Sequence, residues 1–282
     1  MSTYLKQGWG LTVKHLPIAA FLFLYRLLWG FFLYRLVDSV VRPLVQRYPG
    51  ADGAASGADA IFWAESQFRL LKTDLAHPYL WLLGGLLLAR LLLGPLLSAG
   101  LAYSVRHAAE SGAEGGTRFL EGIRVCWKPF ILLAAAELTL ALAPAVWLAR
   151  EGFQRFQHYS SLPQLAADAL PWAGAWLLWI GLLHVLILSL QFGAASGLGA
   201  GASFRQALRR LLPLAGVSLV LLLLSGLLQA GVSAGAMAWA GLAAIVIQQG
   251  YHFVRTLIDV WILSAQYSCW SDKPDAGGRQ VS

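Results

Sequence analysis

The sequence predicts an all-α, polytopic membrane protein, and three observations support that prediction. The chain has 282 residues, of which 58% are hydrophobic and only 12% are charged, whereas about a quarter of an ordinary soluble domain is charged. Apolar runs of about 20 residues recur along the chain, and that length crosses a hydrocarbon core roughly 30 Å thick. The runs are rich in leucine and uninterrupted, whereas the strands of a membrane barrel alternate apolar and polar residues.

Six segments have the length and composition of a membrane-spanning helix. In chain order they are Leu16–Val41, Tyr79–Tyr103, Pro129–Leu148, Leu170–Phe192, Leu211–Gly231 and Met237–Tyr267. Residues 1–268 are therefore predicted to form a single six-helix transmembrane domain, and residues 269–282 a short cytoplasmic tail. The first segment is not read as a cleaved signal peptide, because it contains Arg26 and lacks a small-residue cleavage pattern.

The distribution of lysine and arginine predicts that both termini are cytoplasmic. Positive residues favour the cytoplasmic side, and an inside N-terminus places most of them there. These residues are Lys6, Lys14, Arg106, Arg118, Arg124, Lys128, Arg205, Arg209, Arg210, Lys273 and Arg279. The net charge of +7 thus reflects membrane topology, and no basic cluster interleaved with aromatic residues predicts a nucleic-acid partner. The predicted partners are the lipid bilayer and either other membrane proteins or further copies of the chain.

Three short segments that precede the first, third and fifth spans resemble one another. As helices, each would have one apolar and one basic face, which is typical of helices lying in the membrane surface. Each then meets a proline, which can begin a new helix at its first turn. The segments are residues 4–16 with Pro17, 118–128 with Pro129, and 203–212 with Pro213; the first has Leu5, Trp9 and Leu16 on its apolar face. The pattern predicts either three repeats of an interfacial helix plus a hairpin, or three basic anchors of unrelated helices.

The outer loop, residues 42–78, divides into two parts. Residues 49–59 are rich in glycine and alanine and predict a flexible linker. Residues 61–75 repeat apolar side chains at three- and four-residue steps, which predicts a surface helix buried against lipid or the bundle, or a partner site.

Two repeating patterns mark the fourth span. Trp172, Trp176 and Trp179 recur near its outer end, where indoles suit the headgroup boundary, so they are predicted to be interfacial anchors. Glycines then repeat at every fourth residue across 193–201. If the helix continues through them, a neighbouring backbone can approach closely.

Polar side chains at membrane depth are the candidate functional residues. A charge at the centre of a span costs roughly 2.5–3.5 kcal/mol on insertion scales, so such residues turn toward protein or water. Steps of four, three and four place four polar residues of the last span on one helix face. The predicted cluster, whose role is either ligand binding or structure, consists of Gln248, His252, Arg255, Asp259, Arg26, Arg90, Glu137 and His184.

Topology predicts partners for some members of this cluster. The second and third spans form a hairpin, so Arg90 and Glu137 are expected to pair. The last span exceeds the thickness of the hydrocarbon core, and Arg255 at its cytoplasmic end could extend its guanidinium to the headgroups. That explanation leaves Gln248 and His252 as the two polar residues that most require a role.

Several kinds of chemistry find no support in the sequence. There is no closely spaced histidine and glutamate motif for zinc, and no phosphate-binding loop for ATP hydrolysis. Cys126 and Cys269 form no disulfide framework and no metal-binding spacing. We therefore predict no catalytic residue, no metal and no cofactor, and a protein that is not an enzyme.

Residues 100–130 and 201–214 carry a resemblance to a known group. Each consists of a helix end, a small polar turn and a basic amphipathic segment leading into the next span. This order resembles a broad group of six-helix bacterial membrane proteins, which includes the membrane domain fused to some glycerophosphodiester phosphodiesterases. The resemblance implies a multi-pass protein of the bacterial cytoplasmic membrane. It carries over no enzymatic residue, since the catalytic domain of those phosphodiesterases has no counterpart here.

Three function hypotheses follow. The first is a non-catalytic membrane component, a scaffold or an accessory subunit of a transport or envelope assembly. The second is a transporter or channel-like carrier of a small polar solute, whose route the polar cluster lines. The third and weakest is an intramembrane lipid-processing enzyme that uses His184 or His252. Access of water to the cluster separates the first two hypotheses.

Overall fold

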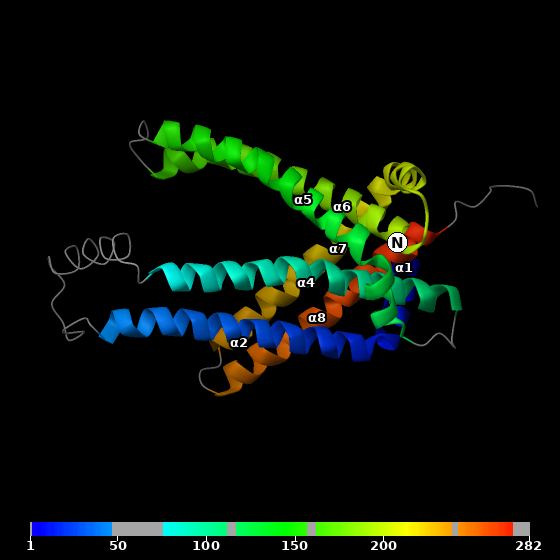
Figure 1. The fold of residues 1–282 in the computed structure, drawn as a ribbon, viewed down its shortest axis with the longest axis horizontal. Helices are drawn as coiled ribbons and strands as arrows, with labels where there is room; N and C mark the ends of the chain where they lie inside the picture. Colours follow the sequence, from blue (N-terminus) through cyan, green and yellow to red (C-terminus); the bar gives the residue numbers. More distant parts are fainter. Residues whose placement is uncertain (1, 47–75, 112–116, 157–161, 239–241, 273–282) are drawn as a thin grey trace, which may run out of the picture. The chain divides into compact units, whose positions relative to one another are not determined.

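The computed structural model describes residues 2–46, 76–111, 117–156, 162–238 and 242–272, and these are almost entirely α-helical, which confirms the all-α prediction (Figure 1). The predicted linker 49–59 and surface helix 61–75 lie outside the described residues. The helices are α1 (Ser2–Lys14), α2 (Leu16–Gln46), α4 (Ala76–Ser111), α5 (Phe119–Phe156), α6 (Leu162–Ala195), α7 (Ala200–Ala238) and α8 (Leu242–Ser271).

The chain divides into two compact units, residues 22–94 and the remainder. The smaller unit contains most of α2 and the first half of α4. Within it the rings of Tyr25 and Trp29 stack with their centroids 6.3 Å apart. The guanidinium of Arg90, on α4, acts electrostatically on the Tyr25 hydroxyl.

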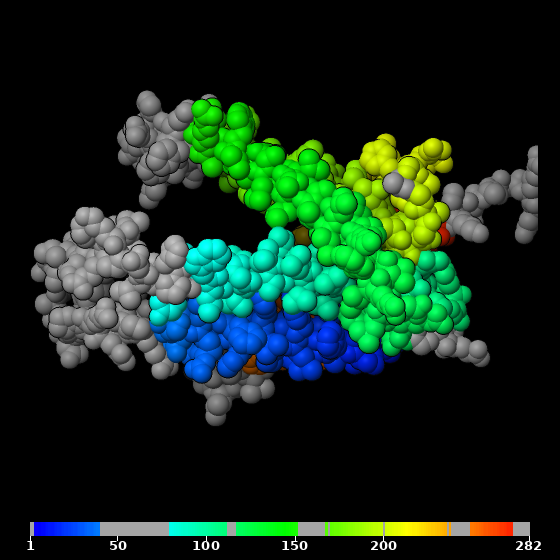
Figure 2. Space-filling view, in the orientation of Figure 1, coloured from blue at the N-terminus to red at the C-terminus, as the bar shows by residue number. Residues whose placement is uncertain are grey.

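The larger unit is a set of helices packed as sequential neighbours. Helices α5 and α6 form an antiparallel hairpin, α7 packs against α6, and α8 against α7, while α1 lies along α8. In Figure 2 the side chains of the α5–α6 hairpin, drawn in shades of green, pack together without a gap. An aromatic cluster near the ends of α6 and α8 is part of the core, with the Phe192 and Tyr267 rings 5.4 Å apart and Trp270 next to both.

Five helices in the described part of the chain are long and apolar enough to cross a membrane. These spans are Leu16–Ser39, Tyr79–Ser111, Phe119–Glu151, Leu170–Ala195 and Gly201–Gly235. Large apolar side chains cover their outer surfaces; Leu132 and Leu178, for example, are 70% and 71% exposed, as lipid-facing positions would be. A membrane protein with transmembrane helices is therefore supported. Helix α8 does not meet the same criterion, so the sixth span and the threefold repeat stay predictions.

A buried histidine separates α1 from α2. His15 is 1% exposed, and its Nδ1 lies 2.7 Å from the carbonyl of Leu11. A carbonyl only accepts, so Nδ1 carries the hydrogen, and Nε2 lies within hydrogen-bond distance of the Ser104 hydroxyl, at 3.0 Å. Pro17 follows at the start of α2, where its missing N–H costs nothing. The predicted new helix at Pro17 is confirmed.

The same prediction is wrong for the other two prolines. Pro129 lies inside α5 and Pro213 inside α7, so the basic segments before them are the first turns of the spans themselves. Buried residues on both sides hold these helices together through the proline: Cys126 and Phe130 in α5, and Ala207, Leu214, Val217 and Leu221 in α7. Of the three basic segments, only residues 4–16 form a separate short helix, α1.

Helix α1 packs against α8 through small residues as well as through Trp9 of its predicted apolar face, whose ring centroid lies 5.3 Å from that of Trp261. Gly8 and Thr12 are buried, whereas Trp9 and Leu16 are half exposed. At Gly8 the two backbones meet so closely that an added Cβ would lie 2.7 Å from the Cα of Ala265 in α8. The Trp261 indole reinforces the contact by donating to the Leu5 carbonyl at 3.0 Å.

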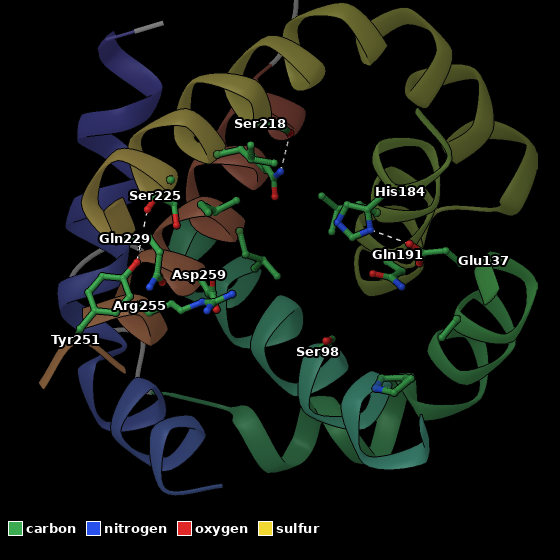
Figure 3. Close-up of a pocket in the computed structure, with 18 residues that line it drawn as sticks. Ser98, Glu137, His184, Gln191, Ser218, Ser225, Gln229, Tyr251, Arg255 and Asp259 are labelled. Atoms are coloured by element: carbon green, nitrogen blue, oxygen red, sulfur yellow. Dashed lines mark hydrogen bonds and ion pairs between the residues drawn. The ribbon is translucent and has the colours of Figure 1, made fainter. Parts of the chain in front are cut away.

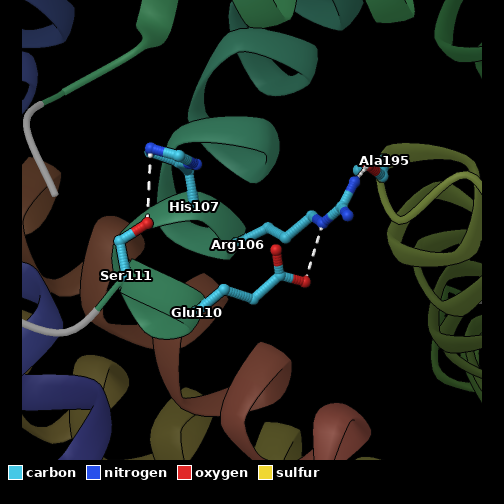
Figure 4. A network of polar contacts seen from close by, with 5 residues as sticks. All are labelled: Arg106, His107, Glu110, Ser111 and Ala195. Carbon is cyan, nitrogen blue, oxygen red and sulfur yellow. Dashed lines mark hydrogen bonds and ion pairs between the residues drawn. The ribbon is translucent and has the colours of Figure 1, made fainter.

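The turn between α6 and α7 depends on glycine and arginine (Figure 4). Helix α6 ends at Ala195, and Gly197 follows with φ +68°, a left-handed conformation that glycine adopts without strain. Arg106 of α4 donates to the Ala195 carbonyl at 2.5 Å and to Glu110 at 2.9 Å. The glycine repeat therefore does not lie in one helix. Of its members, Gly193 makes the close contact, with the Ser203 side chain against its Cα.

Two of the indoles predicted to be interfacial anchors donate hydrogen bonds within the protein, and their place at the headgroups stays a prediction. Pro144 lies inside α5 and has no N–H, so the Leu140 carbonyl four residues earlier loses its helical donor. Trp179 of α6 donates to that carbonyl at 3.1 Å, and Trp176 donates to the next one, Ala141, at 3.0 Å. The third indole, Trp172, packs edge-on against another tryptophan of α5.

A double-mutant cycle tests this compensation. Trp179→Phe should destabilise the protein by about 1–2 kcal/mol, because it leaves the Leu140 carbonyl unsatisfied. In a Pro144→Ala background the cost should largely vanish, since the alanine would supply the missing N–H. The cost of Trp179→Phe in each background is obtained from the free energy of unfolding, measured in mixed micelles. Trp172→Phe is the control and should cost the same in either background; an undiminished cost of Trp179→Phe would contradict the account.

Two glycines of α1 test its packing against α8. Gly8→Ala should cost about 1–3 kcal/mol, because the new Cβ meets backbone atoms that cannot move aside. Gly10→Ala is the matched control: nothing lies within 4 Å of that Cβ, and alanine favours helix. Thermal unfolding in detergent compares the two variants, and equal effects would show that α1 does not dock as described.

Candidate functional site

A cavity of about 880 Å³ lies in the larger unit, lined by side chains from α4, α5, α6, α7 and α8 (Figure 3). Its volume falls within the range of about 300–1,000 Å³ that is usual for small-molecule sites. Polar groups lie on every wall, although four of these helices are apolar enough to cross a membrane. The walls bring together residues that are far apart in the sequence, from Ser98 to Gln266.

A histidine–carboxylate pair occupies one side of the cavity. His184 of α6 and Glu137 of α5 face each other across the hairpin, with Nδ1 2.7 Å from Oε1. The side chains are 58% and 27% exposed, so the pair is open to the cavity rather than sealed within the hairpin. Because a carboxylate only accepts unless it is protonated, the ring nitrogen is the donor. Gln191 lies two turns after His184 on the same wall.

Helices α7 and α8 form the opposite side and are joined by hydrogen bonds at two levels. The Gln266 amide donates to the Ser218 hydroxyl at 2.7 Å, and this hydroxyl donates to the Leu214 carbonyl at 2.7 Å. The Tyr251 hydroxyl points toward the Ser225 carbonyl at 3.5 Å. Between these two levels of bonds, the residues of α8 that line the cavity are Arg255, Asp259, Ile262 and Leu263.

Arg255 and Asp259 lie on this α8 wall, between the two levels of bonds (Figure 3). Helix α8 continues to Ser271, so Arg255 is 16 residues, or roughly 24 Å along the helix, from that end. At that distance its guanidinium does not reach the end of the helix. The end of the helix does not mark the membrane surface, so the extension of Arg255 to the headgroups stays a prediction.

The remaining residues of the predicted cluster are His252, Gln248, Arg26 and Arg90. His252 is exposed, but on a face of α8 that does not line it. Gln248 belongs to α8, and its side chain lies outside what the structure describes. Arg26 and Arg90 belong to the smaller unit. The Arg90–Glu137 pair would join the two units and stays a prediction, whereas Glu137 has a partner in its own unit that was not predicted.

Three polar residues of the walls, Ser218, Gln229 and Gln266, were missed in the sequence, although a signal for them exists. The four-, three- and four-residue steps that mark the α8 stripe continue from Arg255 through Asp259 to Gln266. On α7 the same steps join Ser218 through residues 222 and 225 to Gln229. His15 was missed too, since it precedes the first predicted span.

The described residues hold no candidate metal centre: no three histidine, cysteine, aspartate or glutamate side chains come together there. Cys126 and Cys269 are free and buried. Burial raises the pKa of the Cys269 thiol and so keeps it protonated and unreactive. The polar groups of the cavity can donate and accept hydrogen bonds and hold charge.

Comparison with family models, curated proteins and solved structures gave no match for this chain. The resemblance to six-helix bacterial membrane proteins therefore stays a prediction and assigns no residue to the site.

The coupling between His184 and Glu137 can be measured with a second cycle. Replacing each by alanine, singly and together, should give a coupling energy of about 1–2 kcal/mol, since one partner is charged and the helices pack within a membrane. The exposed pair Arg118–Glu121, whose nitrogen and oxygen are 3.5 Å apart, is the control and should couple by less than about 0.5 kcal/mol. A His184–Glu137 coupling no larger than the control would mean that the contact is incidental.

Proposed function

We propose that this protein is an integral membrane carrier that binds a small polar solute in the cavity between α4 and α8. The observation that carries the proposal is the polar lining of a cavity of about 880 Å³ formed by membrane-spanning helices. Polar groups at membrane depth are costly, and they typically mark a water-filled route or a binding site. Pure helix packing would satisfy these groups against one another rather than around an open space.

The proposal includes six spans, with α8 as the sixth. The two ends of the described chain meet, because the Tyr4 hydroxyl donates to the Asp272 carboxylate at 2.7 Å. Termini on one side of a membrane require an even number of crossings, and five helices qualify by composition. The polar stripe of α8 lowers its hydropathy but faces the cavity, so lipid need not solvate it.

The proposed orientation places these joined ends in the cytoplasm. Helix α1, the end of α4 and the starts of α5 and α7 carry the basic residues that favour that side. The cytoplasmic membrane of a bacterium is the proposed location.

The scaffold hypothesis predicts the opposite property for the same cavity, namely that water does not enter it. Two adjacent leucines of α7 allow a clean test, because both are well exposed but only Leu222 lines the cavity; Leu222 is 65% and Leu223 56% exposed. Each is changed to cysteine in a background with Cys126 and Cys269 replaced by alanine, so that neither variant alters a charged residue.

Cysteine at position 222 should react with a small aqueous thiol reagent at least about tenfold faster than cysteine at position 223. Only a thiol in contact with water forms the reactive thiolate, and position 223 lies off the cavity wall. Labelling rates in native membranes give the comparison, with an Asp259→Cys variant as a second cavity position. Equal, slow labelling at all three positions would favour the scaffold.

A further inference from the structure

We propose that Arg255 is the binding residue for an oxyanion, a carboxylate or a phosphate, carried by the solute that enters the cavity. This inference rests on the proposed function, because it requires an accessible cavity. Figure 3 shows Arg255 on the α8 wall without a hydrogen bond or ion pair to any residue drawn there. The structure records none to any other described residue.

The charges around Arg255 support an anion as its partner. Arginine keeps its charge even in a low-dielectric site, and it binds carboxylates and phosphates through two parallel N–H donors. On the opposite wall, the carboxylate of Glu137 is already bound to His184. Asp259 lies one turn along the same helix, and no ion pair joins it to Arg255 in Figure 3. The guanidinium is thus the free cation on the wall within the described residues.

The surroundings of Arg255 leave room for such a group and supply neutral donors. Gly226 of α7 lines the cavity, and a Cβ added there would meet nothing within 4 Å. The Gln229 amide lies one turn beyond, and its contact with the Ser233 hydroxyl, at 3.4 Å, is long and easily exchanged. The Tyr251 hydroxyl is at the same level of the cavity, and its bond to the Ser225 carbonyl is also long, at 3.5 Å.

The anionic group has two possible sources, a soluble solute or a lipid headgroup, and both present the same oxygens to arginine. The test uses the purified full chain in nanodiscs of phosphatidylcholine, at constant ionic strength. The midpoint of thermal unfolding is followed while inorganic phosphate or succinate is added, and again in nanodiscs in which phosphatidylglycerol replaces part of the phosphatidylcholine.

The wild-type protein should gain thermal stability with at least one of these probes. A rise with phosphate or succinate identifies a soluble anion, and a rise only with phosphatidylglycerol identifies a headgroup. Arg255→Gln should weaken the apparent affinity about 10- to 100-fold, as expected for the loss of hydrogen bonds from a charged donor. Arg209→Gln removes the same charge from an exposed position outside the cavity and should leave the response unchanged.

A second variant guards against misfolding of Arg255→Gln. Gly226→Leu keeps the guanidinium but fills the adjacent space, and it should also abolish the response. Gly231→Leu is its control on the same helix, since that position is equally open but not part of the cavity.

The proposal is overturned if no probe stabilises the wild type or if Arg255→Gln responds to the probes like the wild type. It is also overturned if Arg209→Gln weakens the response as much as Arg255→Gln does. Fast labelling at position 222 combined with any of these results leaves the carrier proposal standing and removes only the anion. Slow labelling there removes both.

Discussion

The guanidinium of Arg106 donates to the last carbonyl of α6, and that of Arg210 donates to the Cys269 carbonyl near the end of α8. These bonds meet a demand common to all helices, because the last carbonyls of a helix have no donor within it and need a partner from elsewhere. Trp179 meets the same demand where Pro144 interrupts α5. In each case the donor comes from a different helix, so satisfying the backbone also ties two helices together.

These ties explain why a polar cavity can exist between apolar helices. Glycine contacts such as Gly8 on Ala265, together with the arginine-capped ends, hold the helices at fixed rotations. The hydrogen bond from Gln266 to Ser218 joins α7 and α8 where Arg255 and Asp259 line the cavity. The cost of placing polar residues at membrane depth is offset where they face one another or water, and that arrangement is what a binding site for a polar solute requires.

The two sides of the cavity differ in how their charge is balanced. Glu137 and His184 balance each other across a hairpin, which leaves this side close to neutral when the pair shares its proton. Arg255 belongs to a helix whose neighbours offer hydroxyl and amide groups. A solute that spans the cavity would therefore meet a histidine–glutamate pair on one side and, on the other, the arginine and aspartate of α8 among hydroxyl and amide groups. Such asymmetry orients a ligand as well as binding it.

The sequence by itself determined the class of the protein, five of its spans and the presence of polar residues at membrane depth. Hydropathy and helix length are local properties that add residue by residue, so they can be read without a fold. Tertiary structure decided which polar residues meet. His252 and Arg255 are three residues apart, and the sequence pattern favoured a role for His252 over one for Arg255, yet of the two only Arg255 lines the cavity. Helix rotation makes that choice, and it follows from contacts between segments far apart in the chain, such as Gln266 with Ser218 and Gly8 with Ala265.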